Sequence, residues 1–258
     1  MSRITGILRA LGFLLFTLPL MPVQLLFIGF WPSMGRRFPH AYHRGLCRIL
    51  GFRPVISGAQ LPAGPCLLVG NHVSWIDIVI LSAVLPLSFV AKREVARWPL
   101  FGIMAKLQGT VFINRERRHS TGKHRDELLE RLQGGEAMML FPEGTSGDGA
   151  SVRPFKSSFF AAATSDEIAV VPISLAYTHE WNMPLTRRNL PRYAWYGDMD
   201  LLPHLWAVLC GGPLRVEVIV HEALQVETAR HRKQASAMAE KQVRKGLIEA
   251  LHGRANMR

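Results

Sequence analysis

Short apolar runs alternate with segments of helical periodicity over most of the chain after residue 60. Runs of strand length lie at 66–69, 88–91, 110–113, 137–141, 169–174 and 214–220. Helical patterns lie at 74–84, 98–108, 125–132, 157–163 and 226–251. This alternation predicts an α/β fold with a mostly parallel central sheet flanked by helices. Residues 178–212, rich in aromatic residues and proline, are expected to form an irregular surface excursion.

The first 44 residues have a different pattern. No charged side chain occurs from Leu11 to Trp31, and basic residues flank this apolar stretch on both sides. The length is sufficient for one membrane span, but Pro19, Pro22 and Gly29 fit two shorter helices within one leaflet equally well. A signal peptide is the alternative, although the stretch is long for one. We therefore expect an N-terminal membrane-anchoring helical element at 1–44 and one α/β domain at 45–258.

The overall charge favours an anionic partner. The chain has a net charge of +12 and a pI of about 10.4. Nucleic acid is not expected, because the basic residues are scattered and form no recognised binding motif. The cysteines, Cys47, Cys66 and Cys210, have no metal-ligand or disulfide spacing, so a reducing, cytosol-facing environment fits best.

The segment G-N-H-V-S-W-I-D at 70–77 places His72 and Asp77 at the end of a predicted strand. Ser74 and Asp77 resemble a capping box, so a helix is expected to start with Ser74 as its cap. His72 then precedes the helix and Asp77 lies in its first turn, where the two side chains can meet. Such a pair suits general-base catalysis, with the carboxylate orienting the imidazole. The alternative is that Asp77 only caps and His72 only lines a turn.

No serine or cysteine nucleophile motif accompanies this pair. A G-x-S-x-G elbow, an H-E-x-x-H zinc motif and a Walker loop are all missing from the sequence. The histidine is therefore expected to act directly on a substrate hydroxyl, without a covalent enzyme intermediate.

Other predicted strands also end in polar residues. Arg115 follows the strand at 110–113, Lys92 follows the strand at 88–91, and F-P-E-G-T follows the strand at 137–141. Parallel strands place their carboxyl ends at one edge of a sheet, where α/β proteins bind ligands. Each segment alone is also typical of an ordinary surface turn, but their convergence predicts one site for an anionic group.

These segments together resemble the glycerolipid acyltransferase family, in particular its lysophosphatidic acid acyltransferase group. The first block, N-H-x-S-x-x-D, begins at Asn71; the second, G-x-x-F-I-x-R, runs from Gly109 to Arg115. The third, F-P-E-G-T, runs from Phe141 to Thr145, and an apolar block lies around Pro172. The blocks occur in family order over residues 66 to 175.

The resemblance implies that His72 is the general base and that Asp77 orients it. It implies that Arg115, helped by Lys92, contacts the acceptor head group, and that Glu143, Gly144 and Thr145 shape the acceptor pocket. The reaction would transfer an acyl group from acyl-carrier protein or acyl-CoA to a lysolipid hydroxyl, without a metal or a bound cofactor. The α/β domain would then face the cytoplasm at the inner membrane.

The acceptor and the reaction class each leave an alternative. The segments S-G-D-G-A-S-V-R-P-F-K at 146–156 and Y-A-W-Y-G-D-M-D at 193–200 resemble a bacterial subgroup that acylates lyso-ornithine lipid. Lysophosphatidate remains the other candidate acceptor. Asp198 and Asp200 suit the ornithine cation, or are plain surface carboxylates. The rival functions are a membrane-associated lipid or phosphoester hydrolase that uses the same pair, and a non-catalytic membrane protein.

Overall fold

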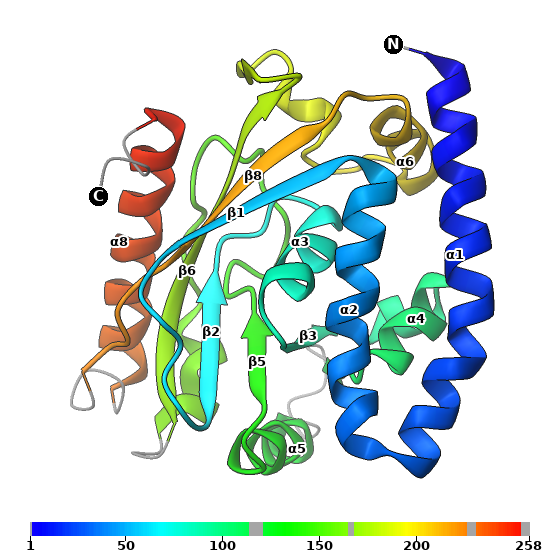
Figure 1. The fold of residues 1–258 in the computed structure, drawn as a ribbon. Coiled ribbons are helices and arrows are strands. Elements are labelled where there is room, and N and C mark those ends of the chain that lie inside the picture. Colours follow the sequence, from blue (N-terminus) through cyan, green and yellow to red (C-terminus); the bar gives the residue numbers. More distant parts are fainter. Residues whose placement is uncertain (1, 114–120, 165–167, 226–230, 254–258) are drawn as a thin grey trace.

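A central sheet runs through the computed structural model, which describes residues 2–113, 121–164, 168–225 and 231–253 (Figure 1). Its strands are β1 (Phe52–Gly58), β2 (Cys66–Gly70), β3 (Ser88–Lys92), β4 (Val111–Ile113), β5 (Ala137–Leu140), β6 (Ala169–Glu180), β7 (Met183–Pro184) and β8 (Leu214–Val220). Their order is β1-β8-β6-β2-β5-β3-β4, with β7 beside β6. All neighbours are parallel except β6 with β8 and β6 with β7. The prediction of a mostly parallel sheet is confirmed.

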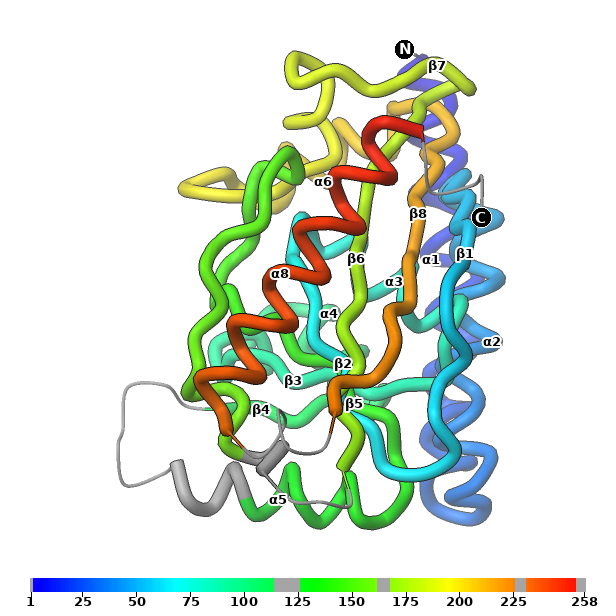
Figure 2. The backbone as a smooth tube through the Cα atoms, turned by 90° about the vertical axis from the view of Figure 1, so that its left-hand side faces the viewer, coloured from blue at the N-terminus to red at the C-terminus, as the bar shows by residue number. Residues whose placement is uncertain are grey.

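Helices cover both faces of this sheet. The α-helices are α1 (Arg3–Phe30), α2 (Pro32–Leu50), α3 (Ile76–Val84), α4 (Phe101–Leu107), α5 (Thr121–Gln133), α6 (Leu201–Leu209) and α8 (Arg232–Leu251), and the 3₁₀ helices are η1 (Arg93–Arg97), η3 (Ser157–Thr164) and η4 (Leu190–Arg192). Figures 1 and 2 show α8 on one face, α2 and α3 on the other, and α1 outside α2.

The central strands are apolar because both of their faces are covered. Every residue of β2 is buried, and alternate residues enter different cores. Leu67 and Val69 join the core beneath α8, whereas Cys66 and Leu68 join the core beneath α2 and α3. Burial on both faces therefore stabilises the position of β2, which leads directly into the N-H-x-S-x-x-D segment.

The N-terminal helix α1 is continuous through Pro19 and Pro22, and α2 returns beside it. The alternative of two short helices within the apolar stretch is therefore not what the structure shows. The position at which the sequence analysis divides the chain, between residues 44 and 45, lies inside α2.

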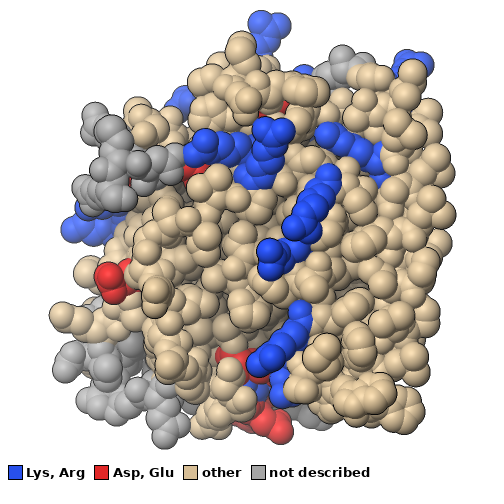
Figure 3. Space-filling view, in the orientation of Figure 1, with Lys and Arg blue, Asp and Glu red and all other residues tan. Residues whose placement is uncertain are grey.

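The polar and apolar sides of α1 are reversed relative to a soluble surface helix. Its buried residues are Gly6, Thr17 and Gln24, whereas its exposed face carries large aliphatic side chains such as Leu15 and Leu18. Within the described residues, α1 is the helix long and apolar enough to cross a membrane by length and composition. Figure 3 shows that the surface along α1 is nearly free of charge, whereas Lys and Arg side chains spread over the neighbouring face.

Strand β1 is absent from the elements that the sequence pattern predicts. It carries Arg53 and Pro54 near its start, and after the buried Phe52 all of its positions are partly or fully exposed. β1 lies at the edge of the sheet, where proline is tolerated because one side of the strand needs no ladder hydrogen bonds. The apolar signal of an edge strand is correspondingly weak.

Residues 178–212 are more regular than the sequence indicates, so the prediction of an irregular excursion is wrong for much of this segment. Strand β6 continues to Glu180, and α6 forms nine residues of helix at 201–209. Two helical predictions also need correction: η3 has 3₁₀ geometry, and α8 begins at Arg232. Residues 226–230 lie outside the described residues.

Candidate active site

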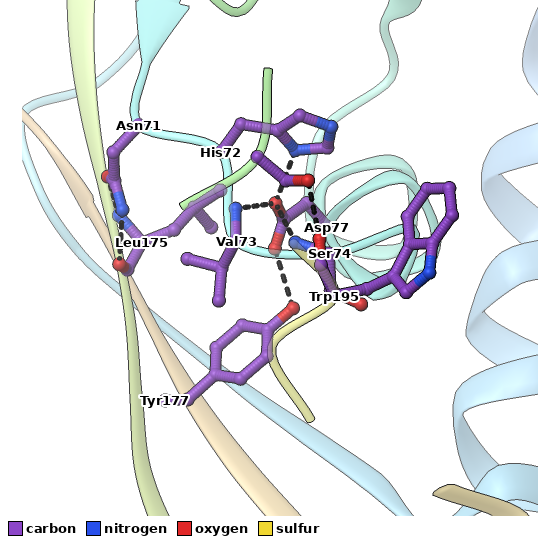
Figure 4. A network of polar contacts seen from close by, with 9 residues as sticks. Asn71, His72, Val73, Ser74, Asp77, Leu175, Tyr177 and Trp195 are labelled. Atoms are coloured by element: carbon purple, nitrogen blue, oxygen red, sulfur yellow. Dashed lines mark hydrogen bonds and ion pairs between the residues drawn. The ribbon is translucent and has the colours of Figure 1, made fainter. Parts of the chain in front are cut away.

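The loop after β2 folds back so that Asp77 faces His72. Nδ1 of His72 lies 2.7 Å from Oδ2 of Asp77 (Figure 4). The same oxygen accepts the backbone N–H groups of Val73 at 2.7 Å and Ser74 at 3.0 Å. The structure thus brings together the two residues that the motif predicts to meet.

The expected capping role of Ser74 is wrong. Helix α3 begins at Ile76, and no side-chain hydrogen bond caps it. Instead, the carboxylate in its first turn reaches back to the loop amides, as acidic groups at helix N-termini do. The Asp77 side chain therefore organises the loop before the helix, and this arrangement sets the position of His72.

The second oxygen of Asp77 has a partner that the sequence analysis missed. The phenol of Tyr177, on β6, donates a hydrogen bond of 2.6 Å to Oδ1 of Asp77. Both side chains are essentially without solvent exposure. Burial, followed by the charge of Asp77, raises the pKa of Tyr177 well above its usual range, so this phenol remains a donor.

This network fixes the tautomer of His72. A carboxylate only accepts hydrogen bonds, so Nδ1 carries the hydrogen and Nε2 is left with a free lone pair. The imidazole stacks on the ring of Phe141 with centroids 4.1 Å apart and planes at 15°. Its side chain retains 21% exposure. Nε2 can therefore accept a proton from a bound molecule.

Asn71 anchors the loop to the sheet. Its Nδ2 donates to the carbonyl of Leu175 at 2.9 Å, and the N–H of Leu175 donates to its Oδ1 at 2.8 Å. This paired contact joins the first motif to β6, two residues before Tyr177. The catalytic candidates are thus held from two neighbouring strands.

The F-P-E-G-T segment closes the other side of the site. β5 lies parallel to β2 with Val69 opposite Leu140, so Phe141 emerges beside the His72 loop. The N–H of Gly147 donates to the carbonyl of His72 at 2.8 Å, and Gly144 has a φ of 79°, which favours glycine. The two loops are therefore connected at their backbones.

Glu143 is a buried carboxyl next to this connection. Glu143 is only 3% exposed, and its Oε1 accepts a hydrogen bond from the backbone N–H of Arg153 at 3.3 Å. Burial raises the pKa of Glu143 to about 8, although the backbone amides of Arg153 and His72 oppose the rise. Glu143 thus holds a proton over most of the physiological range.

The remaining predicted residues differ in their surroundings. Lys92 ends β3, is exposed and lines the cavity described below, whereas Gly144 is buried and Thr145 is exposed. Because β2, β5, β3 and β4 are consecutive in the sheet, their carboxyl ends lie along one edge. Arg115 lies outside the described residues.

A long apolar cavity of about 610 Å³ opens beside His72. Its walls come from α1, α2, α3, α4 and α6, and Phe141 also lines it. Lining residues of α1 extend from Ala10 to Gln24, which corresponds to about 21 Å at about 1.5 Å per residue. That exceeds the depth of roughly 15 Å of one leaflet of a bilayer's hydrocarbon core. The cavity therefore has the length and polarity for a fatty acyl chain.

Two tryptophans at this cavity were not among the predicted site residues. The rings of Trp98 and Trp195 lie 5.7 Å apart at 79°, and both line the cavity together with His72. The backbone N–H of Trp195 donates to the carbonyl of Val73 at 2.9 Å. The segment at 193–200 stands out in the sequence through its resemblance to the lyso-ornithine lipid subgroup and through its carboxylates, and neither feature marks the Trp195 ring as part of the site.

Among the described residues, no group of three or more His, Cys, Asp or Glu side chains is placed to hold a metal ion. The described part of the candidate site consists of the partly exposed His72 beside the buried Asp77, an adjoining apolar cavity, and Lys92 in the cavity lining.

Comparison with known proteins identifies the class. A family model described as Acyltransferase matches residues 53–176. Over 92% of this chain, the sequence is 43% identical to the lyso-ornithine lipid O-acyltransferase of Brucella abortus (strain 2308), of which 92% is covered. The chain therefore belongs to the acyltransferase family and is an O-acyltransferase.

Other relatives are named either lyso-ornithine lipid O-acyltransferase or 1-acyl-sn-glycerol-3-phosphate acyltransferase. The lyso-ornithine lipid O-acyltransferase of Rhizobium meliloti (strain 1021) is 40% identical over 92% of this chain and 84% of its own. The 1-acyl-sn-glycerol-3-phosphate acyltransferase of Neisseria gonorrhoeae is 37% identical over 62% of both chains. The crystal structure of 1-acyl-sn-glycerophosphate acyltransferase from Thermotoga maritima matches with a TM-score of 0.57 at 20% identity, covering 94% of this chain and 97% of that one. This last match shows the shared fold.

Proposed function

We propose that this enzyme transfers a fatty acyl group from acyl-carrier protein or acyl-CoA to the free hydroxyl of lyso-ornithine lipid. The observation that carries the proposal is the His72–Asp77 pair at 2.7 Å, which opens onto an apolar cavity of acyl-chain length. The acceptor is inferred from relatives that are 43% and 40% identical over nearly the whole chain. Lysophosphatidate is the second candidate acceptor, favoured by the Neisseria relative.

In the proposed mechanism, His72 is the general base. Nε2 takes the proton of the acceptor hydroxyl as that oxygen attacks the thioester carbonyl carbon. The carbon–sulfur bond then breaks, and the leaving thiolate takes the proton from the imidazolium. Asp77 keeps Nδ1 protonated and stabilises the positive ring between these two steps. The products are an ester and a free thiol.

In our proposal, some residues around this pair shape the pocket and others contact the acceptor head group. Glu143 and Gly144 are buried, so they would shape the pocket by holding the loop beside His72. Thr145 and Lys92 are exposed at the rim, where they would contact the acceptor head group. Arg115 would add a second cation there. No separate cofactor is required, because the thioester donor supplies the activated acyl group.

The side chains on α1 support membrane association. Its outward face is aliphatic, its inward face carries Thr17 and Gln24, and the cavity wall is formed partly by this helix. We propose that α1 contacts the lipid of the inner membrane while the α/β domain faces the cytoplasm. A lysolipid would then enter the cavity from the leaflet without crossing water.

The test is an acceptor-and-donor assay with the full-length protein in membranes. Lyso-ornithine lipid and lysophosphatidate are offered separately, each with acyl-carrier-protein and CoA donors. We expect the ester product to form faster from lyso-ornithine lipid. Faster use of lysophosphatidate would reassign the acceptor. Release of free fatty acid or phosphate without any donor dependence would favour a hydrolase and contradict the proposal.

A further inference from the structure

Trp195 is held against both loops of the candidate active site. Its N–H donates to Val73, its carbonyl accepts the hydroxyl of Ser146, and its indole Nε1–H donates to the carbonyl of Met199 at 2.8 Å. Figure 4 shows its indole and the imidazole of His72 on the side of the network turned away from Leu175 and Tyr177. The ring therefore has a fixed position at the cavity rather than a free rotamer.

Trp98 completes an aromatic corner. Its ring meets that of Trp195 at 79° with centroids 5.7 Å apart, and both rings line the cavity next to His72. In this edge-to-face arrangement, the pair presents the π face of one indole beside the edge of the other. Tryptophan is the aromatic side chain that binds organic cations most strongly, at about 6 Å or less from the ring centroid.

Charged residues of opposite sign neighbour the two tryptophans along the chain. Asp198 and Asp200 flank Met199, whose carbonyl closes the turn with the Trp195 indole, and both carboxylates are exposed. Lys92, which lines the same cavity, and Arg93 lie a few residues before Trp98 and are also exposed. Carboxylates therefore neighbour Trp195 along the chain, and Lys92 lines the same cavity as both tryptophans.

We propose that the Trp98–Trp195 corner is the subsite for the cationic amine of a zwitterionic acceptor head group, with Lys92 facing its carboxylate. The inference rests on the proposed function, because it takes lyso-ornithine lipid as the acceptor and names the residues that select it. An ornithine head group carries one side-chain ammonium, which suits the tryptophan rings, and one carboxylate, which suits Lys92 in the same cavity. A phosphate head group offers no cation to the rings.

The experiment compares two acceptors with the full-length enzyme in membranes. One is lyso-ornithine lipid, and the other is the same lipid with its side-chain amine acetylated, which replaces the cation by a neutral amide. The variants are Trp195→Leu, which removes the ring, and Trp195→Phe, which retains a smaller one. The matched control is Trp181→Leu, because Trp181 is exposed on the turn after β6 and does not line the cavity.

We expect the wild type to prefer the free amine by about 5- to 30-fold in kcat/KM, mostly through KM, as a partly desolvated cation–π contact would give. Trp195→Leu should reduce this ratio to about 1, Trp195→Phe should retain part of it, and Trp181→Leu should keep it in full. A variant that only damages the fold would lower both rates and leave the ratio unchanged.

Two results overturn the inference while the proposed function stands: equal use of both acceptors by the wild type, or an unchanged preference in Trp195→Leu. A wild type that acylates lysophosphatidate but neither ornithine lipid overturns the proposed acceptor and this inference with it. These outcomes are distinguishable because the wild-type rates are measured in the same assay.

Discussion

Tyr177 and Asp77 are joined by a hydrogen bond of 2.6 Å although they lie 100 positions apart in the chain. The phenol occupies Oδ1, which leaves Oδ2 for His72 and the amides of the motif loop. Strand β6 thus contacts one oxygen of the carboxylate through Tyr177, and the loop after β2 contacts the other oxygen through the backbone N–H groups of Val73 and Ser74. This arrangement explains why a fully buried carboxylate can keep one orientation toward the imidazole.

Removal of the Tyr177 hydroxyl should weaken this orientation. For Tyr177→Phe we expect a loss of about 1.5–3 kcal/mol in the free energy of unfolding, because a hydrogen bond to a buried charged group is lost. We also expect kcat to fall roughly tenfold, since about 1.4 kcal/mol of lost positioning corresponds to that factor. Tyr193→Phe is the control: that phenol is buried but contacts Gly212, and its removal should leave the kcat of the folded enzyme unchanged.

Asp77→Asn should separate geometry from charge. The amide oxygen can still accept the loop N–H groups, but a neutral group no longer stabilises the imidazolium or enforces the Nδ1–H tautomer. We expect kcat to fall by about 10²–10⁴-fold with little change in the KM of the acceptor. A kcat within threefold of wild type in steady-state assays would refute the orienting role.

The buried Glu143 should produce a pH dependence of stability. Its pKa in the folded state is about 8 against a usual value of 4.5, so the folded protein binds more protons than the unfolded chain between these values. Stability should therefore fall as the pH rises from about 5 to about 8, with a slope approaching about 1.4 kcal/mol per pH unit. Below about pH 5, the contribution of the protonated Glu143 carboxyl to the stability of the folded protein is fully present.

Glu143→Gln tests this linkage because the amide keeps the acceptor for Arg153 and cannot ionise. Thermal unfolding of both proteins at pH 5, 6.5 and 8 should show the Gln variant gaining stability relative to wild type as the pH rises. Parallel pH profiles for the two proteins would show that Glu143 does not titrate in this range.

The outward face of α1 should set membrane retention. Leu15 is 75% exposed and Leu18 is 53% exposed, although both are fully apolar. Burial of each leucine in lipid contributes about 1.5–3 kcal/mol, so Leu15→Glu combined with Leu18→Glu should shift the protein from the membrane to the soluble fraction. Met238→Glu on α8, at the opposite side of the molecule in Figure 1, should leave the distribution unchanged. Flotation in a density gradient measures both, and equal loss in both variants would point to general misfolding.

Burial explains which parts of the fold were predictable from sequence. β2 and β5 are covered on both faces, so their apolar runs are unambiguous and the residues after them fall at the site. Edge strand β1 contains Pro54 and partly exposed positions, and this pattern does not separate it from a loop. Ser74 fitted a capping signature, but the competing acceptor in the first turn, Asp77, took the loop amides.

Only those site contacts that join residues close together in the sequence were predictable. His72 and Asp77 are five positions apart, so local geometry predicts their contact. Tyr177 and Trp195 reach the same loop from distant parts of the chain, and no periodicity connects them to it. Such contacts depend on sheet order, which the sequence does not display.

General-base catalysis by His72 is tested by the rate of acyl transfer of His72→Ala. The full-length variant and the wild type are compared at equal amounts in membranes, with the acceptor and the donor that the wild type uses best. Because His72 is partly exposed and Oδ2 of Asp77 keeps the backbone N–H donors of Val73 and Ser74, the melting temperature should change little. We predict a loss of kcat of about 10²–10⁴-fold with an unchanged melting temperature. Retention of more than a tenth of the wild-type rate by the folded variant would contradict general-base catalysis by His72.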